Sequence, residues 1–143
     1  MRKLTLSDRF LPHQYIRIET EIGIKIPHNI KDFISEYADL SVKENKFINK
    51  DGKLFEISQF ITYSMMYDFI KEFKEEDLGK KLPFAIDNGG WIFCISFDEK
   101  SMNQVLLYQM EMEWKTKEDA FEFVANGFEE FINGLQEETA KDI

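Results

Sequence analysis

The segment from Trp91 to Phe97 constrains the fold more than any other part of the chain. In an extended strand, successive side chains point to opposite faces, and here both sets of side chains are mostly apolar. One face carries Trp91, Phe93, Ile95 and Phe97, and the other carries Ile92, Cys94 and Ser96. Because exposed apolar surface is unfavourable in water, we expect a central strand that is at least partly covered on both sides.

Helical spacing of apolar residues predicts a helix in four places. The first three are residues 13–22, 27–38 and 64–76, where apolar side chains recur every three or four positions. Gly23 suits the end of the first helix, because glycine adopts the left-handed conformation at little cost. The fourth and longest stripe predicts a helix over 117–135. Its members are Phe121, Val124, Phe128, Phe131 and Leu135.

Short extended segments between these helices predict the rest of a sheet. Residues 46–48 and 54–57 flank an Asp-Gly turn and indicate a hairpin. Residues 104–113 indicate a further strand, and 113–115 could add a short one. The stretch 82–90 is expected to be a turn that leads into the central strand.

Together these elements predict an α+β fold in a single domain. The expected order is roughly α-α-β-β-α-β-β-(β)-α. Short connections between successive strands favour antiparallel pairing, so we expect a mostly antiparallel sheet with the helices packed on it. A chain of 143 residues with 14 phenylalanines is large enough for one core. We expect one domain over 1–143, with its core at about 13–135 and a polar tail at 136–143.

The chain is acidic, with a formal net charge of −9. Nucleic-acid binding depends on clustered Lys and Arg, so nucleic acid is not an expected partner. A basic protein surface would be attracted, although the same charge could serve solubility alone. The sequence has no apolar run of membrane-spanning length and no apolar stretch of the signal-peptide kind. We therefore expect a cytoplasmic protein with no membrane partner.

The residue pattern does not indicate catalysis. His13 and His28 have no Cys, Asp or Glu at the spacing of a metal site. Cys94 lies in the apolar strand with no basic neighbour, so we expect a buried, unreactive thiol. The segment 87–90 lacks the Lys and the following helix of a phosphate loop, and a turn is the better interpretation. We expect no enzyme activity, no metal and no cofactor.

Two segments, in this order along the chain, carry a family resemblance. The first is a helix end, a glycine and an Ile-Pro pair that opens the next helix, and the second is a Pro-Phe-Ala turn before the central strand. The matching positions are Glu21, Gly23, Ile26, Pro27, Phe33, Pro83–Ala85, Asp87, Gly89, Gly90, Asp98, Tyr108 and Phe128–Phe131. In order and spacing they resemble the SUKH superfamily of Smi/Knr-type proteins. The strand around 105–110 departs from the family pattern, since it lacks the Asp and His that often end it.

The resemblance implies a SUKH-like fold and a non-enzymatic binding function. Many bacterial members of the family resemble immunity proteins, so we expect this chain to bind and neutralise a cognate bacterial toxin domain, a basic nuclease being one candidate. The alternative is a regulatory or scaffold module related to cell-wall synthesis regulators. The candidate partner-binding residues are Asp87, Asn88, Trp91, Asp98, Tyr108 and Trp114. Trp and Tyr are among the residues most enriched at interface hot spots.

Overall fold

The computed structural model describes residues 11–110 and 113–137. Within these residues the chain forms four α-helices, six strands and two short 3₁₀-helices. The helices are α1 (Pro12–Ile22), α2 (His28–Tyr37), α3 (Tyr63–Glu75), α4 (Phe128–Asn133), η1 (Glu99–Ser101) and η2 (Lys117–Ala120). The strands are β1 (Lys46–Ile48), β2 (Leu54–Phe60), β3 (Lys81–Asp87), β4 (Ile92–Ser96), β5 (Val105–Tyr108) and β6 (Phe121–Ala125).

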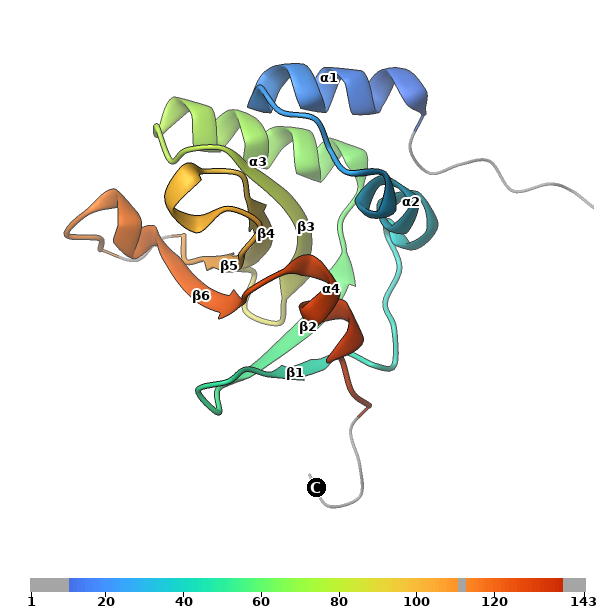
Figure 1. The fold of residues 1–143 in the computed structure, drawn as a ribbon, viewed down its shortest axis with the longest axis vertical. Coiled ribbons are helices and arrows are strands. Elements are labelled where there is room, and N and C mark those ends of the chain that lie inside the picture. The colour runs from blue at the N-terminus through green and yellow to red at the C-terminus, as the bar shows by residue number, and fades with distance from the viewer. Residues whose placement is uncertain (1–10, 111–112, 138–143) are drawn as a thin grey trace, which may run out of the picture.

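The six strands form one antiparallel sheet in the order β1-β2-β3-β4-β5-β6, so that neighbours along the chain are neighbours in space. The sheet curls, and the helices pack on it (Figure 1). Every residue of β4 is buried, as expected for a central strand with two apolar faces. The predicted α+β class, with helices packed on an antiparallel sheet, is confirmed.

The first two helices form where the apolar spacing predicts them. α1 has Pro12 at its first position, where a missing N–H leaves no hydrogen bond unmade. It ends at Gly23 (φ +81°), whose N–H donates to the Glu19 carbonyl at 2.8 Å. The Glu19 carboxylate also accepts the N–H of Ile26 at 2.7 Å. These hydrogen bonds set the direction in which the chain enters α2.

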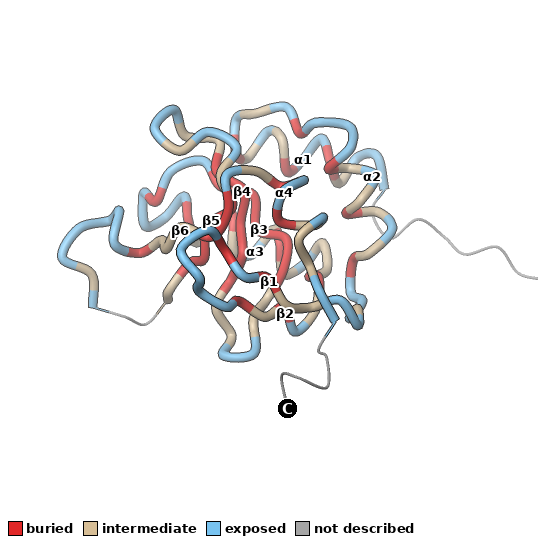
Figure 2. The backbone as a smooth tube through the Cα atoms, turned by 60° about the horizontal axis from the view of Figure 1, so that its bottom comes forward, coloured by how far each residue is buried: buried red, intermediate tan, exposed pale blue. Residues whose placement is uncertain are grey.

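The main core lies between the curled sheet and the helices. α4 sits inside the curl (Figure 1), where the fully buried Phe131 ring has its centroid 4.9 Å from that of Phe47 and 5.3 Å from that of Phe93. Phe128 of the same helix lies edge-on to Phe84 at 5.3 Å. Aromatic pairs at such separations stabilise a core beyond the area that they bury. Figure 2 shows the buried residues concentrated on the central strands.

A smaller apolar cluster lies on the opposite face of β4 and β5. Its buried members are Phe73, Leu78, Ile92, Tyr108 and Ala120. The end of α3 and the segment before β6 cover this face, so β4 has an apolar layer on each side. The two layers explain why both faces of the strand are apolar in sequence.

The prediction of one helix over 117–135 is wrong. The structure has η2, β6 and α4 in its place. Phe121 and Phe123 flank Glu122, so the segment also carries the two-residue period of a strand. The edge of β5 offers this segment a ladder of backbone hydrogen bonds. Gly127, which the helical stripe would enclose, precedes α4 with an extended backbone (φ −161°).

Residues 82–90, expected to be a turn, begin with strand residues. β3 pairs with both β2 and β4, and Pro83 obscured it in the sequence, because proline lacks the N–H that a central strand normally uses. The structure accommodates Pro83 beside a shift in register between Pro83 and Ala85. As a result, four strands follow α3, instead of the two or three that were predicted.

The strand predicted over 104–113 is shorter in the structure, where β5 covers Val105–Tyr108. Residues 111 and 112 lie outside the described residues. Residues 113–115, where a short strand was expected, belong to no strand. The described residues between β5 and β6 therefore lie outside the sheet.

Candidate protein-binding site

The turn between β3 and β4 brings together three of the predicted partner-binding residues, Asp87, Asn88 and Trp91. The Asp87 carboxylate accepts hydrogen bonds from the N–H groups of Gly89 (2.9 Å) and Trp91 (2.8 Å). Gly90 has φ +91°, which favours glycine over other residues. The interpretation of this segment as a turn is confirmed, and Asp87 stabilises it.

The turn forms one side of a cleft of about 350 Å³, which we call the turn cleft. Its lining includes Glu56, Asp87, Asn88, Trp91, Leu107 and Glu122. Asn88 is exposed, and its side-chain amide donates to the Glu56 carboxylate, which ties the turn to β2. Trp91 is partly buried against the main core. The turn cleft thus combines apolar side chains with carboxylates that sequence position alone did not bring together.

Carboxylates outnumber lysines around the turn cleft. Glu56 pairs with Lys46, and Glu122 pairs with Lys53. The carboxylate of Asp87 adds a third negative charge, which has backbone N–H groups as its partners. The surface around the turn cleft is therefore net negative and suits a positively charged group of a partner.

Asp98 lies at the opposite end of β4, in an ion pair with Lys81. Only 9% of the Lys81 side chain is exposed. Its Nζ also donates to the Leu78 carbonyl at 2.7 Å and lies 4.3 Å from the centroid of the Phe121 ring. Asp98 additionally accepts the N–H of Lys80 at 2.9 Å. This carboxylate therefore joins the α3–β3 connection to the end of β4.

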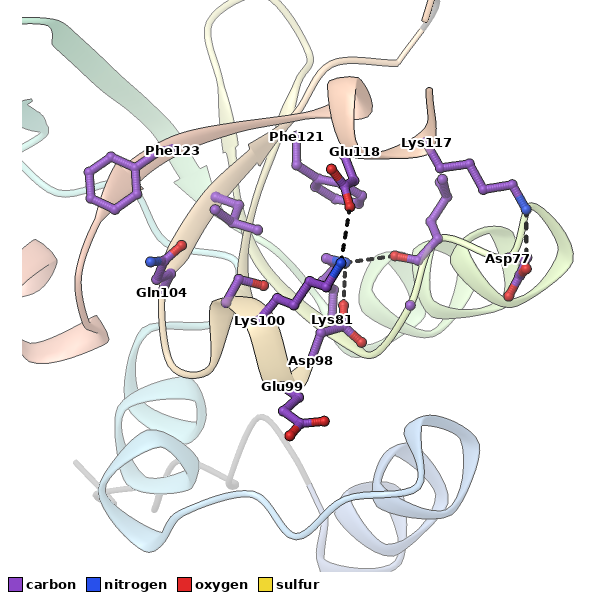
Figure 3. Close-up of a pocket in the computed structure, with 14 residues that line it drawn as sticks. Asp77, Lys81, Asp98, Glu99, Lys100, Gln104, Lys117, Glu118, Phe121 and Phe123 are labelled. Carbon is purple, nitrogen blue, oxygen red and sulfur yellow. Dashed lines mark hydrogen bonds and ion pairs between the residues drawn. The ribbon is translucent and has the colours of Figure 1, made fainter. Parts of the chain in front are cut away.

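The Lys81–Asp98 ion pair also borders a larger hollow of about 690 Å³, which we call the outer cavity (Figure 3). Its apolar lining consists of Leu78, from the connection after α3, and of Leu106, Phe121 and Phe123 from β5 and β6. Its rim carries two further ion pairs, Lys117–Asp77 (3.1 Å) and Lys100–Glu118 (4.0 Å). Positive and negative groups are closely balanced here, with three lysines against four carboxylates in the lining, whereas one lysine and three carboxylates line the turn cleft.

Tyr108 and Trp114 lie close to the end of α3. Tyr108 is 3% exposed, and its hydroxyl donates to the Glu72 carboxylate at 2.7 Å. Burial, followed by this hydrogen bond and the negative charges of Glu72 and Glu76, raises the pKa of Tyr108 well above its usual range. Trp114 is partly exposed, packs on Tyr108 with 5.8 Å between ring centroids and donates its indole N–H to the Gln109 carbonyl at 3.0 Å.

The six predicted residues therefore do not form a single site. One group lies at the turn cleft and consists of Asp87, Asn88 and Trp91. The others lie at the outer cavity and beside the end of α3, and they are Asp98, Tyr108 and Trp114. Only the exposed and partly exposed members can contact a partner directly, whereas Tyr108 can act only by supporting the surface around it. Partner binding by all six residues stays a prediction.

An acidic group at the end of α3 was not among the predicted site residues. We call it the acidic α3 end, and its members are Glu72, Glu75, Glu76 and Asp77. Negative charge at the C-terminal end of a helix is unfavourable, because the helix dipole is negative there. Helix stability therefore does not explain these residues. The run Glu75-Glu76-Asp77 after an apolar helical stripe was the sequence signal that could have identified them.

No group of three or more His, Cys, Asp or Glu side chains in the described part of the chain is arranged to hold a metal ion. Cys94 is fully buried, as predicted, and burial raises the pKa of its thiol to about 12. None of the helices that the structure describes has the length and apolar character of a membrane span.

Comparison with known proteins places the chain in a family. No curated protein and no solved structure matches it. The model of the SMI1 / KNR4 family (SUKH-1) matches residues 13–134, which include every helix and strand of the fold from the first turn of α1 to α4. The chain therefore belongs to the SMI1 / KNR4 family (SUKH-1).

Proposed function

We propose that this protein is an immunity protein, which binds a cognate toxin domain in a stoichiometric complex and blocks its action. The observation that carries the proposal is the family match over residues 13–134, taken with the resemblance of many bacterial members of this family to toxin-neutralising proteins. Such a protein acts by covering a surface of the toxin, and no covalent bond is made or broken.

The charge of the chain favours a basic partner. The net charge is −9, and three exposed carboxylates lie at the acidic α3 end. Trp114 is linked to this end through Tyr108, on which it packs and whose hydroxyl donates to Glu72. Opposite charges on two proteins accelerate their encounter, and a partly exposed tryptophan supplies the kind of contact that dominates binding energy. We place the partner at this surface and at the neighbouring outer cavity.

Co-expression tests the immunity function. The C-terminal domain of the protein encoded immediately upstream is expressed with and without this chain, and surviving cells are counted. We expect the domain to kill on its own and this chain to restore growth. A harmless domain, or killing that persists in the presence of this chain, would argue against the immunity function and in favour of the regulatory or scaffold alternative.

A pair of charge-swap variants tests the binding surface. Glu75→Lys with Glu76→Lys changes the acidic α3 end, and Asp32→Lys with Glu36→Lys makes the same change in net charge on α2. All four residues are exposed. We expect only the first variant to slow association with the toxin domain, by about tenfold at low salt. Equal slowing by both variants would show that net charge matters and that the acidic α3 end does not.

A further inference from the structure

The chain contains three Asn-Gly pairs, at 88–89, 126–127 and 133–134. Asparagine is one of the thermally labile residues of proteins. It is most labile before glycine, because glycine has no Cβ to keep the asparagine side chain away from the next backbone nitrogen. That nitrogen can attack the side-chain amide and displace ammonia. Since glycine follows the asparagine in all three pairs, the structure around each pair decides which of them reacts.

The pair 133–134 is held at the end of α4. Asn133 is the last residue of the helix, and the Gly134 N–H donates to the Glu130 carbonyl at 3.0 Å. In an α-helix the side chain leans towards the N-terminal end, away from the next peptide nitrogen. A Cβ built at Gly134 would lie 2.7 Å from the Phe47 ring, so the space is also restricted. Attack within this pair therefore requires the end of α4 to open.

The pair 88–89 is held in the turn between β3 and β4. The Gly89 N–H donates to the Asp87 carboxylate at 2.9 Å, and the side-chain amide of Asn88 donates to the Glu56 carboxylate. Hydrogen bonds to charged acceptors are among the stronger ones in proteins. Both must break before the nitrogen of Gly89 can attack the amide of Asn88. This pair is exposed to solvent but restrained.

The pair 126–127 lies in the short connection between β6 and α4 (Figure 1). Asn126 is exposed, and no described group forms a hydrogen bond with its side-chain amide or with the Gly127 N–H. The N–H of Asn126 itself donates to the Glu130 carboxylate at 2.8 Å, but it takes no part in the attack. Apart from the chain neighbours, no described atom lies within 4 Å of a Cβ built at Gly127. A ring that joins the two residues therefore has space to form.

We infer that the fold makes Asn126, and not Asn88 or Asn133, the site of spontaneous deamidation in this protein. The Gly127 nitrogen loses its proton to water and bonds to Cγ of Asn126. The Cγ–Nδ2 bond breaks, and Nδ2 takes up a proton from water and leaves as ammonia. Water then opens the resulting succinimide: cleavage between Cγ and the nitrogen gives aspartate, and cleavage between the backbone carbonyl carbon and the nitrogen gives isoaspartate. Solvent water is the co-reactant, and the inference does not depend on the proposed immunity function.

The modification would act on the placement of α4. Phe128 and Phe131 of this helix pack in the main core, directly after the reacting pair. Isoaspartate adds one backbone atom between β6 and α4, so the strand and the helix cannot both keep their places without strain. Aspartate adds only a charge, which the helix dipole attracts and which Glu129 and Glu130 in the first turn repel. We therefore expect isoaspartate to be the more damaging product.

Peptide mapping by mass spectrometry tests the inference on the full wild-type chain. The folded protein is incubated in mildly alkaline buffer, and the loss of each asparagine amide is followed with time. We expect Asn126 to react at least about fivefold faster than Asn88 or Asn133, because those two pairs must first break a hydrogen bond. The same incubation in guanidinium chloride, where no structure restrains the amides, should bring the three rates close together.

Two variants test the chemistry and its consequence. Gly127→Ala places a Cβ next to the attacking nitrogen, and the extended φ of −161° accepts alanine. We expect this variant to lose the Asn126 amide about tenfold more slowly or less, with the rate at Asn88 unchanged. Freshly purified Asn126→Asp represents the aspartate product. We expect the isoaspartate form, separated from incubated wild-type protein, to unfold at a lower urea concentration than this variant.

Several results would overturn the inference. Asn126 could keep its amide in the folded protein, or Asn88 or Asn133 could lose its amide equally fast. A ranking that persists in guanidinium chloride would show that the fold is not its cause. Loss of the Asn126 amide in Gly127→Ala at the wild-type rate would exclude attack by the Gly127 nitrogen as the slow step.

Discussion

At the scale of single residues, Gly79 shows how one position can depend on a distant ion pair. Its φ is +88°, and a Cβ built there would lie 2.3 Å from Asp98 Oδ2 and 2.8 Å from Lys81 Nζ. Neither group can move away easily, because Lys81 is buried and Asp98 also accepts a backbone N–H. Glycine is therefore required both by the backbone conformation and by the space available.

We predict that Gly79→Ala lowers the free energy of unfolding by about 2 kcal/mol, since it combines an unfavourable φ with a steric conflict. Urea denaturation of the purified variant measures the effect. Gly127→Ala is the matched control, because the φ of Gly127 is −161° and nothing lies within 4 Å of its added Cβ. An equal loss of stability in both variants would show that the ion pair imposes no special requirement at Gly79.

Burial of the Cys94 thiol leads us to predict that the free energy of unfolding falls at alkaline pH. Burial raises the pKa of its thiol from 9.0 to about 12, so the folded state keeps the proton over a range where the unfolded state loses it. The stabilising contribution is complete below the unfolded pKa and is lost as pH rises towards the folded pKa. It should fall by about 1.4 kcal/mol between about pH 8 and pH 10.

Comparison with Cys94→Ala isolates this effect from the titration of other groups. Denaturation of both proteins at several pH values gives the difference in their unfolding free energies. We expect the advantage of the wild-type protein over the variant to shrink as pH rises above about 9, in line with linkage between ionisation and folding. A difference that stays constant with pH would mean that the buried thiol ionises as readily as an exposed one.

At the scale of secondary-structure elements, the C-terminal end of α3 carries charges that oppose its own stability. Glu75 and Glu76 lie where the helix dipole is negative. The same carboxylates are exposed and lie in the surface to which we assign the partner. Attraction of a basic partner would explain why these carboxylates lie at a helix end that they destabilise.

We therefore predict that Glu75→Lys with Glu76→Lys raises the free energy of unfolding by about 1 kcal/mol, because cations interact favourably with the C-terminal end of a helix. Thermal unfolding at low salt measures the change. The same variant is expected to associate more slowly with the toxin domain. A variant that is both less stable and slower to bind would point to disruption of α3, and its slower binding would then say nothing about the surface.

Elements also show where sequence patterns suffice and where they do not. α1 and α2 each bury one stripe against the main core, and the stripe of α3 runs from the main core into the smaller cluster at Phe73. In all three helices the helical period is unambiguous. From β6 into α4, the residues Phe121, Val124 and Phe128 have helical spacing, yet Phe121 and Phe123 of β6 also have strand spacing. The neighbouring edge of β5 decides between the two by offering hydrogen bonds, and a local pattern contains no information about that edge.

At the scale of the whole molecule, the net charge of −9 predicts the kinetics of binding. Attraction between an acidic protein and a basic partner is screened over about 8 Å at physiological salt and over about 30 Å at about 0.01 M. We expect the association rate constant with the toxin domain to be about tenfold lower at physiological salt than at about 0.01 M. The dissociation rate constant should change much less. Stopped-flow mixing at several salt concentrations measures both rates. An association rate that does not depend on salt would argue against a basic partner.

The candidate site was predictable only in part, because its members come from distant segments. Asp87, Asn88 and Trp91 share one turn, and the sequence placed them together correctly. Glu56 and Glu122 reach the same turn cleft from β2 and β6. The curl of the sheet brings these strands close, and neither carboxylate has a local signal that assigns it to the turn.

The sequence by itself determined the class of the fold, the first three helices, the buried central strand and the turn that follows β3, because each is encoded by a local period or by turn chemistry. The tertiary structure decided that β3 and β6 are strands, that Asp98 pairs with Lys81 and that Tyr108 is buried. These features depend on hydrogen bonds and packing between segments far apart in the chain. Such interactions exist only once the sheet has formed, so a pattern of neighbouring residues does not contain them.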